Sequence, residues 1–159
     1  MPGIITHNFI LHESIAHLRK KKFRSYLSKS VETLLHDPSR RKAALFGSIG
    51  PDIFDYNILR RNSPFGSRMS FILHNGGSAK LLVSMLDRII AHSDHNTEWA
   101  STQRAFLYGY VSHIIADSLF HPYMFYWSGF PHTGLKKDRY HFREQNLLFC
   151  YNLDLFFLY

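Results

Sequence analysis

The sequence predicts an all-α fold, arranged as a compact multi-helix bundle, and three observations lead to this prediction. Apolar residues recur at intervals of three and four in several segments, as they do along one face of a helix. Gly- and Pro-rich stretches, which break helices, separate these segments. A chain of 159 residues that is 45% hydrophobic and 16% aromatic also has enough apolar material for one packed domain.

The expected helices follow one another along the chain. They span residues 6–21, 24–35, 41–47, 78–92, 98–121 and 139–159, and residues 68–73 lead into the fourth of them. Thr6 is the expected N-cap of the first helix, since its hydroxyl can accept a hydrogen bond from a free backbone N–H. The segment 98–121 is the most regular, and we expect Pro122 to end it because Pro has no N–H to continue a helix.

Turn-forming residues mark the expected connections. These lie at residues 37–39, 47–52, 62–66 and 126–138, the last as a loop over one end of the bundle. In Gly47-Ser48-Ile49-Gly50-Pro51-Asp52, two glycines and a proline place Asp52 on a turn or at a helix start. The last helix runs apolar to Tyr159, so we expect residues 1–159 to form a single domain that is truncated at its C-terminus.

Charge and cysteine content narrow the classes of function. The net charge of +7 and the pI of about 9.6 favour anionic partners such as phosphates, nucleic acid or a lipid surface, or they reflect solvated helix ends. Cys150 is the single cysteine, which excludes a disulfide framework and a cysteine-rich zinc site. No secretory signal begins the sequence, and no apolar run is long enough to span a bilayer, so we expect a cytoplasmic chain without a transmembrane segment.

The strongest chemical pattern lies in the most regular helix. His113, Asp117 and His121 lie four residues apart, so they drift by only about 40° per step and form one stripe. Imidazole and carboxylate are ligands that zinc accepts, and Asp117 in the middle could bridge two ions. A polar stripe beside a loop, or histidines bonded to backbone carbonyls, would explain each residue alone. Three such groups in register favour a metal site.

Further candidates carry less information individually. His141 and Glu144 lie three residues apart on the last helix and could reach one ion, although such pairs are common at surfaces. A structural role as a turn residue or N-cap would be enough to explain Asp52. His74, before Asn-Gly-Gly, could be a loop residue, and His7 could be a core histidine.

Taken together, these patterns resemble the zinc-dependent phospholipase C family, which is related in fold to the S1/P1-type nucleases. The matching residues come in the family's order and span almost the whole chain. They are Thr6-His7, Gly47-x-x-Gly50-Pro51-Asp52, His74, His113-x3-Asp117-x3-His121-Pro122-Tyr123 and His141-x2-Glu144. The resemblance implies an all-helical fold with two or three zinc ions in a cleft between helices.

The resemblance also implies how the ligands divide among the ions. His74, His113 and Asp117 would hold one ion, with Asp52 as a ligand or general base. His121, His141 and Glu144 would hold a second. His7 and a bridging Asp117 would contribute to a third.

The expected activity is zinc-dependent hydrolysis of a phosphodiester, in which a metal-activated water attacks phosphorus in line. A phospholipid is the preferred substrate, with possible contact to a membrane surface. Nucleic acid or another phosphodiester on the same site is an alternative, and a non-catalytic helical metal-binding module is another. The aromatic residues Tyr123, Phe125, Tyr126 and Trp127 could receive a lipid or a base, or they could pack in the core.

Overall fold

The computed structural model describes residues 3–20, 26–55, 64–130 and 136–158, and every regular element within these ranges is helical, which confirms the all-α prediction. The elements are α1 (Ile4–Lys20), α2 (Tyr26–His36), α3 (Pro38–Ile49), the 3₁₀ turn η1 (Gly50–Phe54), α4 (Pro64–Ile72), the π-type turn η2 (Leu73–Gly77), α5 (Ser78–Ile90), α6 (Glu98–Ser128) and α7 (Lys136–Leu158). Parts of two expected loops, residues 62–63 and 131–135, lie outside the described ranges.

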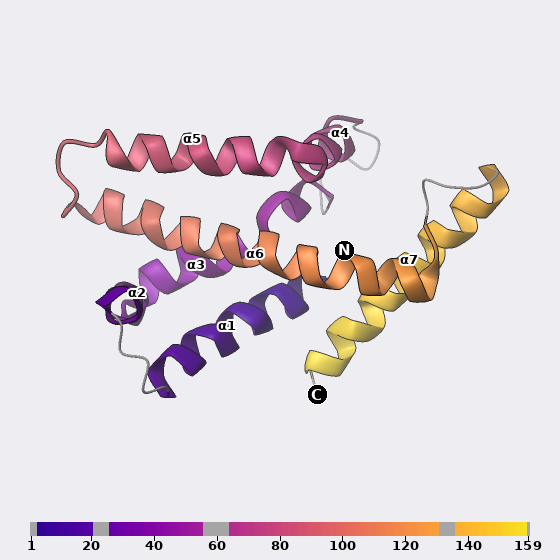
Figure 1. Ribbon diagram of the computed structural model, residues 1–159, viewed down its shortest axis with the longest axis horizontal. Coiled ribbons are helices and arrows are strands. Elements are labelled where there is room, and N and C mark those ends of the chain that lie inside the picture. The colour runs from indigo at the N-terminus through magenta and orange to yellow at the C-terminus, as the bar shows by residue number, and fades with distance from the viewer. Residues whose placement is uncertain (1–2, 21–25, 56–63, 131–135, 159) are drawn as a thin grey trace.

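The 31-residue helix α6 runs through the middle of the molecule and organises the other helices (Figure 1). α5 lies alongside its first half and runs in the opposite direction, while α3 packs against another side. α7 folds back from the end of α6 and reaches α1, so the first and last helices of the described chain are in contact. α6 is therefore the element to which the other parts of the site are joined.

Small residues let α3 and α6 pack backbone against backbone. A Cβ atom at Gly109 would lie 1.9 Å from the carbonyl oxygen of Ala44, and one at Gly47 would lie 2.2 Å from that of Phe106. Gly47 lies inside α3, not in the connector that the sequence predicts, because the missing side chain permits this contact. The turn begins at Gly50, whose φ of 55° ends the helix.

Side-chain caps determine where two of the helices begin. The carboxylate of Asp37 accepts a hydrogen bond from the backbone N–H of Arg40 at 3.0 Å, and Pro38 occupies the first helical position. α3 therefore begins at Pro38, earlier than the expected residue 41. α6 begins at Glu98, as predicted, after Thr97 accepts a hydrogen bond from the N–H of Ala100 at 3.2 Å.

Pro122 does not end α6, contrary to the prediction, and the helix continues to Ser128. The turns after the proline pack against α7: Tyr123 meets Phe149 edge to face, and the hydroxyl of Ser128 donates to Asn146 at 2.9 Å. These tertiary contacts offset the one backbone hydrogen bond that a proline removes. The expected loop over 126–138 is correspondingly shorter, since Tyr126 is helical and α7 begins at Lys136.

Thr6 is not an N-cap, contrary to the prediction. α1 begins at Ile4, and Thr6 lies fully buried in its first turn. Its backbone N–H and its hydroxyl donate to one carboxylate oxygen of Asp154 in α7, at 2.9 and 2.6 Å. The free donors at the start of α1 thus find their acceptor on another helix.

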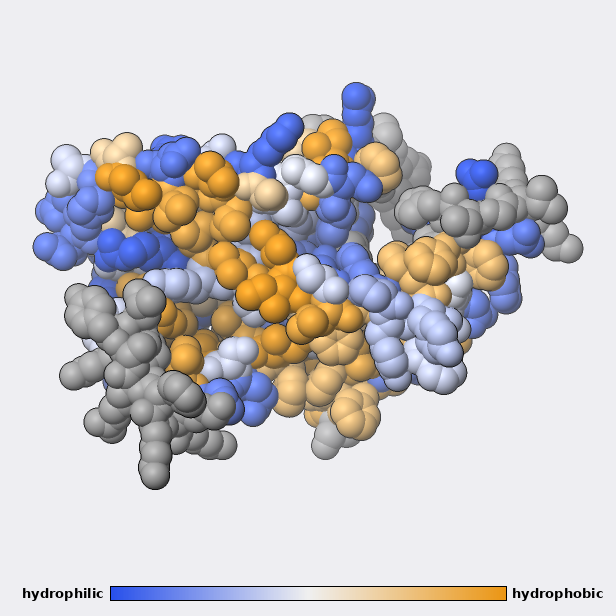
Figure 2. All heavy atoms as spheres, viewed as in Figure 1, coloured by the Kyte–Doolittle hydropathy of each residue, from blue (hydrophilic) through white to orange (hydrophobic). Residues whose placement is uncertain are grey.

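Apolar side chains form a core and also remain at the surface. The core joins four helices through Leu11, Ile15, Leu35, Ala44 and Ala105. Figure 2 shows hydrophobic side chains gathered over α5 and the middle of α6 on one face of the molecule. None of the described helices combines the length and the apolar content that a membrane-spanning segment requires.

Candidate metal centre

Three of the predicted ligands lie on α6 and meet at one carboxylate. Nε2 of His113 lies 3.2 Å from Oδ2 of Asp117, and Nε2 of His121 lies 3.3 Å from Oδ1 of the same side chain. The four-residue spacing brings the three groups to one face, as predicted. The two histidines approach different oxygens of Asp117, which is the arrangement of a carboxylate that can bridge two ions.

The turn η1 brings a second carboxylate to this face of α6. Asp52 is only 2% exposed although it lies in a turn, because Gly50 and Pro51 direct the chain back toward α6. Its Oδ1 lies 3.0 Å from Nε2 of His74, and its Oδ2 lies 3.7 Å from Nε2 of His7. Asp52 is therefore part of the cluster and not merely a turn residue.

His74 enters from η2, the kinked turn between α4 and α5, where Gly76 adopts a φ of 98°. Its Nδ1–H donates to the backbone carbonyl of Ser70 at 2.7 Å. This bond leaves Nε2 as the nitrogen with a free lone pair, and Nε2 lies 3.6 Å from Oδ2 of Asp117.

His113 is held in the same way, by a different backbone carbonyl. Its Nδ1–H donates to the carbonyl of Ser48 at 3.1 Å, so its Nε2 also faces the centre as an acceptor. Ser48 is itself fully buried and donates its hydroxyl to Asn8 at 2.7 Å. A histidine fixed through one nitrogen and free at the other has the arrangement typical of metal ligands.

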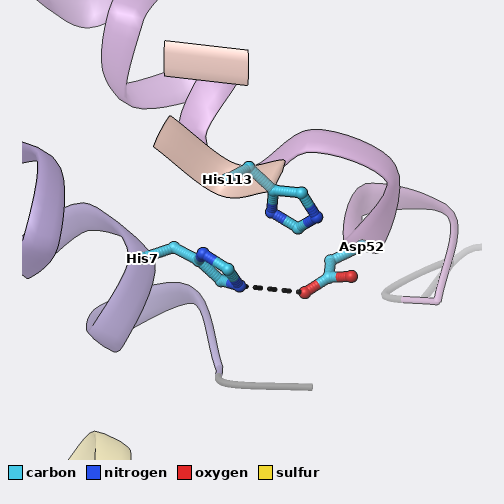
Figure 3. A group of neighbouring side chains, drawn as sticks. All are labelled: His7, Asp52 and His113. Atoms are coloured by element: carbon cyan, nitrogen blue, oxygen red, sulfur yellow. Dashed lines mark ion pairs between the residues drawn. The ribbon is translucent and has the colours of Figure 1, made fainter. Parts of the chain in front are cut away.

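His7 reaches the cluster from α1 (Figure 3). Its ring stacks on that of His113, with centroids 4.3 Å apart, and its Nε2 points toward Asp52. The same nitrogen lies 3.5 Å from Oδ1 of Asp117. His7 is buried, as a core histidine would be, but both of its ring nitrogens lack a hydrogen-bond partner.

Within the described chain, two triplets of potential ligand atoms each lie within 4.8 Å of one another. One is His7, Asp52 and His113, and the other is His74, His113 and Asp117. They share His113, so they form one continuous cluster in which Asp52 and Asp117 provide the negative charge. Nitrogen and carboxylate oxygen are both ligands of zinc.

The pairing of buried atoms tests whether this cluster fits a metal. Buried polar atoms normally have hydrogen-bond partners, because an unpaired one costs about 1–3 kcal/mol. Seven atoms in the cluster have none: Nδ1 and Nε2 of His7, Oδ1 of Asp52, Nε2 of His74, Nε2 of His113, Oδ1 of Asp117 and Nε2 of His121. One or more cations bound among them would give partners to these atoms apart from Nδ1 of His7, because an imidazole offers an ion only one nitrogen, and the residues therefore fit the zinc ions that the sequence predicts.

The surroundings of Asp117 keep its carboxyl group ionised. Burial alone would raise the pKa of Asp117, but its contacts with His113, His121 and His7 outweigh burial and hold that pKa well below the usual range of a carboxyl group. Burial lowers the pKa of His74, whereas Asp52 and the carbonyl of Ser70 raise it, and the net shift is upward. Asp117 is thus negatively charged throughout the neutral pH range.

The remaining predicted ligands lie apart from this cluster. His141 and Glu144 are exposed on α7, and neither belongs to a group of potential ligands within the described residues. The ring of His141 lies next to that of Phe142, at 6.0 Å between centroids. His121 therefore approaches Asp117 without them, and their role in a second site stays a prediction.

Three of the four candidate aromatic residues are exposed: Tyr123 by 55%, Tyr126 by 78% and Trp127 by 64%. Packing in the core does not explain them. Phe125 is half-buried, stacks on Phe130, and lies 5.7 Å from the ring of His121. It is the member of this set that lies next to a cluster residue.

The sequence did not predict the residues that hold the histidines. Ser48 and Ser70 act through backbone carbonyls, which every residue has, so no feature of their side chains could have identified them. Asp55 accepts a hydrogen bond from the hydroxyl of Ser70 at 2.6 Å and supports the same turn of α4. The only feature of the sequence that points to Asp55 is its position three residues after Asp52.

Comparison with known proteins bears on the same residues. No individual curated protein and no solved structure matches the chain. The sequence model of one family, described as zinc-dependent phospholipase C, matches residues 6–153, which include every predicted ligand. Because the match covers nearly the whole chain, the resemblance seen in the motifs is confirmed, and the chain belongs to the zinc-dependent phospholipase C family.

Proposed function

We propose that this chain hydrolyses the phosphodiester of a phospholipid, using zinc held by His7, Asp52, His74, His113, Asp117 and His121. The observation that carries the proposal is the carboxylate of Asp117, whose two oxygens face two different sets of imidazole nitrogens. Membership of the family supports a zinc-dependent hydrolase. The unpaired buried atoms support metal binding at this place.

We assign the ligands by their position around Asp117. His74 and His113 serve one ion on the Oδ2 side, with Asp52 beside them. His121 and His7 lie on the Oδ1 side and would hold further ions, so we propose two or three in all. The pairing of His121 with His141 and Glu144 belongs to the same proposal and is tested separately below.

The protein's own groups then position the reactants. When bound, zinc neutralises charge on the phosphoryl oxygens and makes water acidic enough to react near neutral pH. Asp52, whose Oδ1 lies 3.0 Å from Nε2 of His74, would serve either as a ligand or as the general base that orients the attacking water and accepts its proton. A new P–O bond forms as the bond to the glycerol oxygen breaks, and the proton passes to that oxygen. The products are a diacylglycerol and a phosphorylated headgroup.

Zinc content and hydrolysis, measured on the same preparations, test this proposal. Wild-type protein should contain two or three zinc ions per chain by elemental analysis and should release phosphorylated headgroup from short-chain phosphatidylcholine. Asp117→Ala should lose most of the metal and at least 10²-fold of the rate, since it removes a ligand shared by both sides of the site. Asp87→Ala removes an exposed carboxylate on α5 and should match wild type.

Other results would support a different function for the chain. Digestion of single-stranded DNA without hydrolysis of phosphatidylcholine would support the nuclease alternative. Bound zinc without either activity would leave a helical metal-binding module. Loss of one zinc ion in both His141→Ala and Glu144→Ala would support their place in a second site, whereas full zinc content in both would remove them from it.

A further inference from the structure

The carboxylate of Asp154, near the end of α7, lies against the first turn of α1. One of its oxygens accepts hydrogen bonds from both the N–H and the hydroxyl of Thr6, at 2.9 and 2.6 Å. A Cβ atom at Gly3 would lie 1.9 Å from the other oxygen, so glycine is required for this approach. The start of α1 is thus fitted closely to one acidic side chain.

Thr6 immediately precedes His7, the ligand that α1 contributes to the metal centre. On the other side of His7, Phe9 stacks on Phe157 of α7, with ring centroids 4.4 Å apart. α7 therefore holds the turn that carries His7 at two points. Thr6 and His7 are both buried, at 0% and 1% exposure, so the residues that lie between Asp154 and the cluster are shielded from solvent.

His7 differs from the other histidines of the cluster in how it is held. The rings of His74 and His113 are each fixed by an Nδ1–H that donates to a backbone carbonyl. Neither ring nitrogen of His7 is fixed by a backbone carbonyl; the ring stacks on His113, and its Nε2 lies 3.5 Å from Asp117 and 3.7 Å from Asp52. Because no backbone carbonyl fixes Nδ1 of His7, the direction of its imidazole depends more than that of His74 or His113 on where its own backbone is held.

We propose that Asp154 is a positioning residue for His7. Its carboxylate fixes the first turn of α1, and this helical turn then holds the imidazole of His7 next to Asp52 and Asp117. Without this acceptor, the N–H and hydroxyl of Thr6 would be buried donors with no partner, and the turn would shift to reach water. The inference rests on the proposed function only in that His7 must be a metal ligand.

The test compares metal binding by variants of the full chain. Metal-free protein is titrated with zinc against a chromogenic chelator and, separately, with Co²⁺, whose visible spectrum reports ligand geometry. His7→Ala defines the part of the binding that depends on His7. Asp154→Ala should weaken that same part by about 10- to 100-fold and change the Co²⁺ spectrum in the same sense, as loss of a group that orients a ligand does.

Two variants separate positioning from general destabilisation. Asp154→Asn keeps an acceptor oxygen for Thr6 and should restore metal affinity close to that of wild type. Ile15→Val loosens the same helix at a buried core position and should leave zinc affinity unchanged. If Asp154→Ala does not fold, Thr6→Ala removes one of the two hydrogen bonds and should give a smaller weakening of the same part.

The outcomes decide whether Asp154 positions His7. Weakening in Asp154→Ala with rescue in Asp154→Asn supports the proposal. Metal binding by folded Asp154→Ala that equals wild type, while His7→Ala has lost an ion, overturns it and leaves the proposed function intact. Wild-type protein that binds no zinc or Co²⁺ overturns both.

Discussion

Gly50 lies directly against the imidazole of His113. A Cβ atom at position 50 would lie 2.7 Å from Cγ of that ring, and the glycine has a φ of 55°, where L-residues with side chains are strained. We expect Gly50→Ala to lower the free energy of unfolding by about 2–4 kcal/mol, as strain and overpacking act together. It should also reduce zinc affinity, because the ring of His113 must move. Urea unfolding and zinc titration measure the two effects.

Gly76 provides the matched control for this substitution. It has a φ of 98°, but a Cβ atom there would meet nothing within 4 Å. Gly76→Ala should therefore show only the backbone strain, about 1–2 kcal/mol, with zinc affinity unchanged. Equal zinc affinities in the two variants would show that the contact with His113 does not matter.

Gly109→Ala should separate α3 from α6. The new methyl group would collide with the backbone of Ala44, which cannot rotate away as a side chain can. We expect a net loss of about 1–3 kcal/mol, even after the gain of about 1 kcal/mol in helix propensity. Ser118→Ala, at an exposed position of the same helix, should change stability by less than about 0.5 kcal/mol. A Gly109→Ala variant as stable as Ser118→Ala would mean that the helices are not packed this closely.

His74 should titrate above its ordinary range in metal-free protein. Burial opposes this, but Asp52 and the carbonyl of Ser70 raise its pKa overall. Since the folded-state pKa is raised, the stability that His74 contributes is fully present below a pH of about 6.5 and is lost as the pH rises through the folded-state pKa. NMR titration of the ring should show a pKa above 6.5 that falls in Asp52→Asn. A pKa at or below 6.5 in wild type would contradict the assigned contact.

Cys150 should react slowly with thiol reagents in the folded protein. It is 8% exposed and contacts the sulfur of Met124 at 3.4 Å, and burial raises the pKa of its thiol. Labelling with a chromogenic disulfide should become fast only in denaturant. A Ser93→Cys substitution made together with Cys150→Ala places the thiol in an exposed loop and gives the fast reference rate. Equal native rates would contradict the burial.

Much of the fold could be predicted because its determinants are local. The start of α6 at Glu98 and the course of α5 follow from caps and apolar spacing in nearby sequence. The errors occurred where a distant element overrides a local preference. Pro122 lies inside a helix because α7 packs there, and Gly47 lies inside one because α6 does. Neither contact is visible in the residues around the proline or the glycine.

The geometry of the candidate site could be predicted where its residues share one helix, but the groups on other elements that hold them could not. Helical spacing alone brought His113 and His121 to Asp117. The carbonyls of Ser48 and Ser70, which set the direction of two imidazoles, carry no side-chain pattern. Such groups become visible only after the helices that bear them are placed in three dimensions.

The contact between Thr6 and Asp154 also constrains the order of events during synthesis. The two residues are separated by 148 positions, so the beginning of α1 has no acceptor until nearly all of this sequence has left the ribosome. Contacts of such separation form late, because a long loop must close before they bring any gain. His7 should therefore be the last histidine of the cluster to reach its final position, and the nascent chain should complete the candidate metal centre only after translation of α7.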